Sequence, residues 1–125
     1  MRKQYHFWPS RRGLQAWDVH RLIELTRDFP KKRVALDTIS ELDEVYWFDG
    51  GAQQPTCRKV VEHFRLTREA SLEYPIILGA DGRVMDGMHR IAKALLRGDE
   101  GIEAVQFEED PEPDYVGRKP EELPY

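Results

Sequence analysis

The chain has few of the features that fix a compartment or a cofactor by themselves. It contains one cysteine, Cys57, in 125 residues, which excludes an internal disulfide and a zinc site built from several thiolates. No apolar run approaches the roughly 18 residues that a membrane helix needs, and the N-terminal stretch lacks the apolar segment of a signal peptide. We therefore expect a soluble, cytoplasmic protein with no membrane partner.

Charge is unevenly distributed along the chain, although the formal net charge is only -4. Residues 1–33 hold nine Lys and Arg against three Asp and Glu, whereas residues 99–125 hold two against ten. We favour either attraction between this basic head and acidic tail within one fold or charged ends that are merely solvated, because proteins that bind nucleic acids are usually basic overall. DNA therefore remains a less favoured partner.

The length fits one domain, and composition marks its two ends. Residues 1–16 combine basic and aromatic side chains without a clear period, which predicts an irregular arm. Residues 108–125 hold four of the eight prolines and seven acidic residues, which predicts an extended acidic tail. The folded domain is expected to span residues 17–107.

Hydrophobic spacing within this domain predicts three helices and several short strands. Helical spacing begins after Asp18 and after Thr56, each a suitable N-cap, and it begins again at Met88 and ends at Gly98. The strand-like runs are residues 33–39, 74–78, 83–85 and 102–107. Turn residues separate the second run from the third, which predicts a hairpin. The pattern is typical of an α+β domain in which helices pack on a small mixed sheet.

Two of the expected helices carry apolar faces that should be buried. The first face consists of Cys57, Val60, Val61 and Phe64, and the second consists of Met88, Ile91, Ala92 and Leu95. Burial of the first face predicts an inert thiol at Cys57 rather than a reactive one.

The segment "DGMHR", residues 86–90, joins a strand-like run to the start of the third helix. Amides in the first turn of a helix have no partner within it, and the helix dipole adds positive charge there, so a phosphate or carboxylate is a natural ligand. Gly87 allows close approach, Arg90 offers a fork of donors, and His89 can donate a hydrogen bond or a proton. Asp86 could cap the helix, orient Arg90 or His89, or hold a magnesium ion.

Residues 75–107 resemble the central segment of the ParB/sulfiredoxin-like superfamily, in which a hairpin, a Gly-x-[His/Arg]-Arg motif, a helix and a strand form the ligand-binding region. The segment "RVALDTISELDE" resembles the opening of such domains and extends the similarity to roughly residues 33–107. Members of this superfamily bind nucleoside phosphates. The resemblance implies a nucleoside di- or triphosphate, with Mg²⁺ as its accompanying ion. Its ligands would be Gly87, Met88, His89 and Arg90.

Departures from the family pattern narrow the expected activity. Met88 stands where sulfiredoxins carry their reactive cysteine, and the chain is too short for the DNA-binding and dimerisation parts of a partition clamp. The motif is most similar to the "DGxHR" version of free-serine kinases. That similarity implies a nucleotide-dependent phosphotransferase or NTPase, with Asp86 and His89 as catalytic residues and Glu41 or Glu44 as a further acidic one. The alternatives are a DNA- or protein-binding module without catalysis and a ParB-like nuclease, although no two-metal carboxylate cluster stands out.

Three further features have weaker functional interpretations. Arg58, in the first turn of the second helix, is either a second phosphate ligand or a surface charge. Tyr46, Trp47 and Phe48 could stack on a base, although packing is the favoured role for each ring. The four histidines show no spacing typical of metal ligands, so no metal-binding residue is assigned.

Overall fold

The computed structural model describes residues 3–48 and 54–125 and has the predicted α+β composition. Its α-helices are α1 (Val19–Thr26), α2 (Cys57–Glu69) and α3 (Met88–Arg97). Its strands are β1 (Tyr5–Ser10), β2 (Gly13–Asp18), β3 (Lys32–Ala35), β4 (Ile76–Leu78), β5 (Val84–Asp86), β6 (Gly101–Gln106) and β7 (Tyr115–Val116). Short 3₁₀ helices occupy Leu36–Thr38, Ser40–Asp43 and Pro120–Glu122. Within the described ranges, every helix is too short or too polar to span a bilayer.

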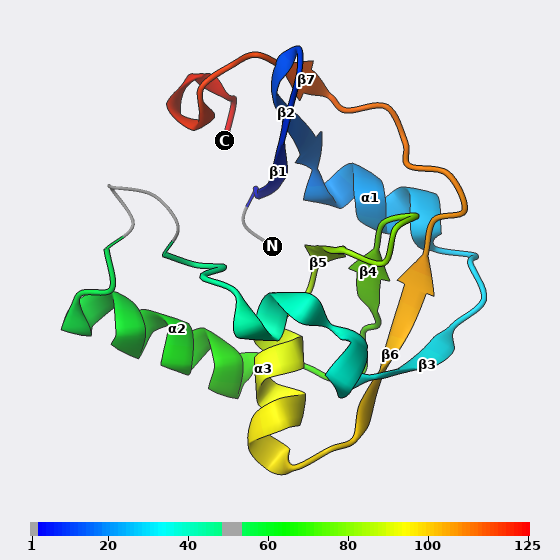
Figure 1. The fold of residues 1–125 in the computed structure, drawn as a ribbon, viewed down its shortest axis with the longest axis vertical. Coiled ribbons are helices and arrows are strands. Elements are labelled where there is room, and N and C mark those ends of the chain that lie inside the picture. The colour runs from blue at the N-terminus through cyan, green and yellow to red at the C-terminus, as the bar shows by residue number, and fades with distance from the viewer. Residues whose placement is uncertain (1–2, 49–53) are drawn as a thin grey trace.

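The larger sheet is mixed and has the strand order β3-β6-β4-β5 (Figure 1). Strand β4 pairs in parallel with β6 and antiparallel with β5, and β3 pairs antiparallel with β6. The predicted hairpin is therefore the β4-β5 pair. Helix α3 follows directly from β5 at Gly87, so the "DGMHR" segment lies at the junction of an edge strand and a helix.

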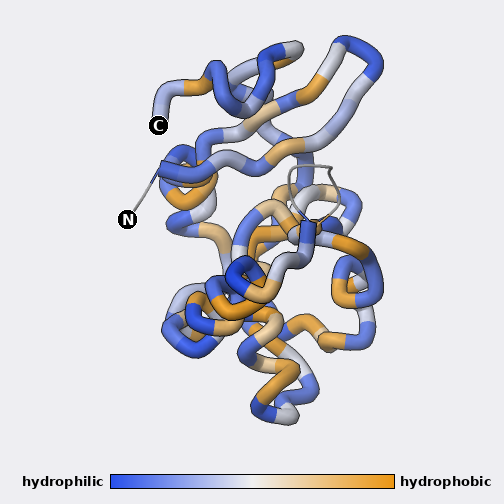
Figure 2. Tube along the Cα trace, turned by 90° about the vertical axis from the view of Figure 1, so that its left-hand side faces the viewer, coloured by the Kyte–Doolittle hydropathy of each residue, from blue (hydrophilic) through white to orange (hydrophobic). Residues whose placement is uncertain are grey.

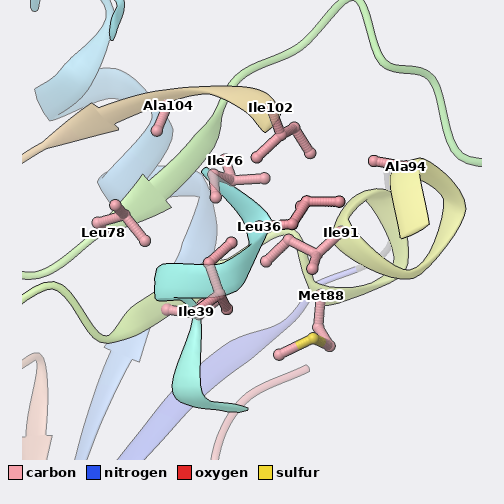
Figure 3. Close-up of a cluster of buried hydrophobic side chains, with 10 residues drawn as sticks. Leu36, Ile39, Ile76, Leu78, Met88, Ile91, Ala94, Ile102 and Ala104 are labelled. Carbon is pink, nitrogen blue, oxygen red and sulfur yellow. The ribbon is translucent and has the colours of Figure 1, made fainter. Parts of the chain in front are cut away.

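The larger sheet is packed on both faces, because successive residues of a strand point to opposite sides. On one face, Ile76 and Leu78 join the α3 residues Met88, Ile91 and Ala94 and the 3₁₀-helix region that includes Ile39 (Figure 3). On the other face, residues of β2, α1, β4 and β5, together with residues in and just after β6, form a second cluster, namely Trp17, Leu22, Ile77, Met85, Val105 and Phe107. Both sides of β4 are therefore buried, which explains its uninterrupted apolar sequence.

The N-terminal residues form a hairpin rather than the irregular arm expected for residues 1–16. Strands β1 and β2 pair antiparallel from Tyr5 opposite Asp18 to Ser10 opposite Gly13. Gly13 has a φ of 115°, and a Cβ there would lie 2.8 Å from the Cα of Gly117. This close contact between two turns that lie far apart in the chain requires glycine. The hairpin was not predicted, because its residues show no periodic hydrophobic pattern.

The acidic tail folds back onto this hairpin instead of extending away from the domain. Strand β7 pairs with β2, which completes a three-stranded sheet of order β1-β2-β7. The indole N–H of Trp17 donates to the carbonyl of Pro111 at 2.8 Å, and Arg21 pairs with Asp114 at 2.6 Å. Of the two favoured alternatives, attraction within the fold or solvated ends, this pair is an example of the first. Hydrophilic residues dominate the upper part of the chain in Figure 2, whereas apolar segments are more frequent in its lower half.

All three helices begin where the sequence predicted. The apolar faces expected on α2 and α3, however, are not buried as predicted. Val61 and Phe64 of α2 are exposed, and so is Cys57, because α2 packs on α3 through its histidine and threonine side, which includes Thr67. In α3 the buried residues are Met88, Ile91 and Ala94, whereas Leu95 is 55% exposed. The expected partial burial of Cys57 was therefore wrong.

Candidate functional site

A cleft of about 730 Å³ lies beside the start of α3. It is lined by residues of β1, α1, the segment before α2, the segment before β4 and the β5-α3 junction. Its cationic side chains are Arg27, Lys31 and Arg90, and its aromatic rings are Tyr5, Tyr46, Trp47 and Tyr74. Asp86 is the carboxylate among the described residues that line it. The walls therefore combine positive charge with flat apolar surfaces.

Gly87 sets the geometry at which α3 enters the cleft. Its φ is 111°, a left-handed conformation that other residues rarely adopt. A Cβ at this position would lie 2.7 Å from Cγ2 of Ile76 and 2.9 Å from Nη2 of Arg90. No side chain caps this helix start. The first-turn amides of α3, which have no acceptor within the helix, are therefore left without a side-chain cap at the edge of the cleft.

Asp86 and Arg90 form an ion pair across the first turn of α3. Nη2 of Arg90 lies 2.8 Å from Oδ2 of Asp86, and the two side chains are only 17% and 18% exposed. Burial raises the pKa of the Asp86 carboxyl, and Arg90 opposes that rise. Of the roles predicted for Asp86, the structure thus shows contact with Arg90 and not capping. Nε of Arg90 is buried without a hydrogen-bond partner, so one of its donors is not used by the protein.

His89 is bonded to a second histidine that the sequence did not point to. Its Nε2 lies 2.9 Å from Nδ1 of His63 in α2. The indole of Trp47 stacks on both imidazoles, with ring centroids 4.4 Å from His63 and 4.7 Å from His89. Burial, together with the neighbouring His63, lowers the pKa of His89 to about 4, and burial also lowers the pKa of His63. Both rings are therefore neutral at pH 7.

Other residues predicted for the site lie outside the cleft or reach it only through the backbone. The side chain of Met88 is buried in the core, which leaves only its amide for a ligand. Glu41 is 3% exposed and accepts a hydrogen bond from the amide of Val84 at 2.6 Å, while Glu44 pairs with Arg83. Arg58 is exposed at the start of α2. None of these last three lines the cleft, and Glu41 contacts the backbone of β5.

Several cleft residues were missed because nothing local in the sequence marks them. Arg27 and Lys31 reach the cleft from the segment after α1, and Tyr5 reaches it from β1, and all three lie far from residues 86–90 in the chain. His63 lies 26 residues before its partner His89. Trp47, considered as a stacking ring, does line the cleft, but it stacks on the two histidines. Among the described residues, no group of three or more His, Cys, Asp or Glu is placed to hold a metal ion.

Comparison with known proteins found no relative of this chain. No protein-family model, curated protein or solved structure matched the chain. The similarity to the ParB/sulfiredoxin-like superfamily therefore stays a prediction from residues 33–107.

Proposed function

We propose that the cleft binds the phosphate groups of a nucleoside di- or triphosphate at the start of α3. The observation that carries this proposal is the helix start at Gly87, which has no side-chain cap and opens beside Arg90. An anion there would accept hydrogen bonds from the first-turn amides and would meet the positive end of the helix dipole. The guanidinium of Arg90, which lines the cleft, supplies further N–H donors.

The rest of the cleft supports a ligand larger than inorganic phosphate. Its volume of about 730 Å³ falls within the range of roughly 300–1,000 Å³ that small-molecule sites occupy. Arg27 and Lys31 add positive charge for further phosphate groups. The rings of Tyr5 and Tyr74 offer flat surfaces on which a base could stack. A nucleotide matches this combination of cations and rings.

Phosphoryl transfer is a second candidate function, and Asp86 is the residue that favours it. Asp86 lines the cleft beside Arg90, and the raised pKa of its carboxyl suits a group that accepts a proton from a hydroxyl. Arg90 would stabilise the charge on the transferred group. Asp86 is also the carboxylate that would hold Mg²⁺ against bound phosphates, since Mg²⁺ commonly binds through one or two carboxylates.

Calorimetry with CTP, ATP and ADP in the presence of Mg²⁺ tests the binding proposal. We expect the wild-type protein to bind at least one of them with a Kd below about 1 mM, which corresponds to ~4 kcal/mol. Arg90→Ala should weaken binding by at least tenfold, and Arg90→Lys should weaken it less, because the charge stays while the fork of donors is lost. Arg58→Ala is the matched control, since Arg58 also lies in the first turn of a helix but outside the cleft.

Two results would contradict the proposal. The first is the absence of binding for all three nucleotides up to about 1 mM. The second is binding that Arg58→Ala weakens as much as Arg90→Ala does. Circular dichroism of each variant checks that the fold survives the loss of the Asp86 partner.

A further inference from the structure

The paired histidines lie at the edge of the candidate anion site. His89 is the second residue of α3 and lines the cleft, and His63 contacts it from α2. A distance of 2.9 Å between the two ring nitrogens requires one ring to donate and the other to accept. The neutral pair therefore has one N–H within this bond. Trp47 covers both rings and restricts their orientation.

This pair can take up one extra proton without losing its hydrogen bond. If His89 becomes an imidazolium, its Nε2–H donates to the unprotonated Nδ1 of His63, and a charged donor strengthens the bond. The second nitrogen of His89 then also carries a proton. A second added proton would place N–H against N–H and would break the contact. The pair thus has a capacity of one proton.

We infer that an anion entering the cleft is bound together with one proton, which the His63–His89 pair takes up. The inference rests on the proposed function, because it concerns the regulation of that same site. The bound anion supplies the negative charge that an imidazolium beside the cleft otherwise lacks. Binding and protonation then favour each other, as linkage requires of any two ligands that stabilise the same state.

The charged groups around the pair are consistent with this coupling. In the free protein, burial and the neighbouring His63 keep the pKa of His89 at about 4, and burial lowers the pKa of His63, so the pair is neutral. On α2, Glu62 favours protonation of His63 and Lys59 opposes it. On the α3 side, Asp86 is already paired with Arg90.

The remaining walls of the cleft supply mainly positive charge. Arg27 and Lys31 face the cleft from the segment after α1, and Tyr5 and His6 face it from β1. Burial lowers the pKa of His6 to about 4, so it is neutral as well. A bound dianion would therefore supply the negative charge that balances an imidazolium in the His63–His89 pair.

Sulfate is a suitable probe because it keeps two negative charges across the pH range in which the pair titrates. Histidine C2–H resonances would be titrated by NMR with and without saturating sulfate. We expect sulfate to raise the titration midpoint of His63 and His89 by at least one pH unit. By linkage, a shift of one unit means that sulfate binds about tenfold more weakly well above the sulfate-bound midpoint than well below the free midpoint, which lies at about 4.

Two variants separate the pair from other histidines. His63→Phe keeps a ring beside Trp47 but removes the acceptor, and it should reduce the pH dependence of sulfate affinity to less than threefold. His20→Gln removes a histidine that does not line the cleft, and it should leave the wild-type pH dependence unchanged. Sulfate affinity in Arg90→Ala tests separately whether the anion binds at the start of α3.

The outcomes distinguish the coupling from the proposed function. Arg90-dependent sulfate binding without a shift in the histidine midpoints would overturn the coupling and leave the proposed function standing. A full shift that survives in His63→Phe would overturn the role of the pair. If neither sulfate nor any nucleotide binds at any pH, both the coupling and the proposed function fall.

Discussion

The starts of α2 and α3 satisfy their first-turn amides in different ways. Helix α2 begins after Thr56, whose hydroxyl oxygen accepts the amide of Lys59 at 3.2 Å. Helix α3 begins after Gly87, which has no side chain to offer and adopts a left-handed conformation. The start of α2 is exposed, whereas the start of α3 is packed between Ile76 and Arg90 at the cleft. A side-chain cap accepts a hydrogen bond from a first-turn amide. An uncapped helix start beside a cleft leaves these amides free to donate to a ligand.

Substitution of Gly87 should have the largest effect on this comparison. In Gly87→Ala the new Cβ would clash with Ile76 and Arg90, and the left-handed backbone would be strained. We expect a loss of about 3 kcal/mol in the free energy of unfolding, from strain of ~1–2 kcal/mol and overpacking of ~1–3 kcal/mol. Urea unfolding measures this loss as a lower midpoint.

Gly82→Ala is the matched control for that substitution. Gly82 also has a positive φ, of 88°, but a Cβ there would have no neighbour within 4 Å. Gly82→Ala should therefore lower the free energy of unfolding by about 1 kcal/mol, through backbone strain alone. Equal losses in Gly82→Ala and Gly87→Ala would show that the close approach at the start of α3 does not matter.

The pH dependence of stability should depend on the histidines beside α3. The pKa of His89 is about 4 in the folded protein, against an ordinary value of 6.5, so between these values the unfolded chain binds more protons. The contribution of His89 to the free energy of unfolding is therefore fully present above pH 6.5 and is lost as the pH falls to 4. Allowing for partial exposure, we expect His89→Phe to reduce this loss by about 1–2 kcal/mol.

Urea unfolding at pH 4.5, 5.5 and 6.5 measures that difference. His6 should keep part of the pH dependence in the variant, because burial lowers its pKa to about 4 as well. His20→Gln should retain the wild-type profile. A wild-type profile in His89→Phe would mean that His89 is not held neutral in the folded protein.

Local sequence signals predicted the elements that meet at the site. Asp18 and Thr56 cap their helices as expected, and Gly98 ends α3. These signals work because capping and turn formation depend on residues that are neighbours in the chain. The β4-β5 hairpin and the helix start at residues 86–90 follow from the same kind of evidence.

Features that depend on distant contacts were not predictable in this way. Strand β7 lies about 100 residues after β2 in the chain, so neither end of the sequence showed the sheet that they form together. Phe64 is exposed because α2 uses polar residues, including His63 and Thr67, on the side that meets α3. The partners of Glu41 and His89 likewise come from segments 26 to 43 residues away.

The smallest expected effect comes from removal of the cap on α2. Thr56→Ala deletes the acceptor for the amide of Lys59 and should lower the free energy of unfolding by about 1 kcal/mol. Nucleotide affinity should stay within twofold of wild type, because Thr56 does not line the cleft. Urea unfolding and calorimetry on the same preparation measure both quantities. A loss of affinity without a loss of stability would mean that the start of α2 belongs to the binding site, and the contrast between the two helix starts would then no longer hold.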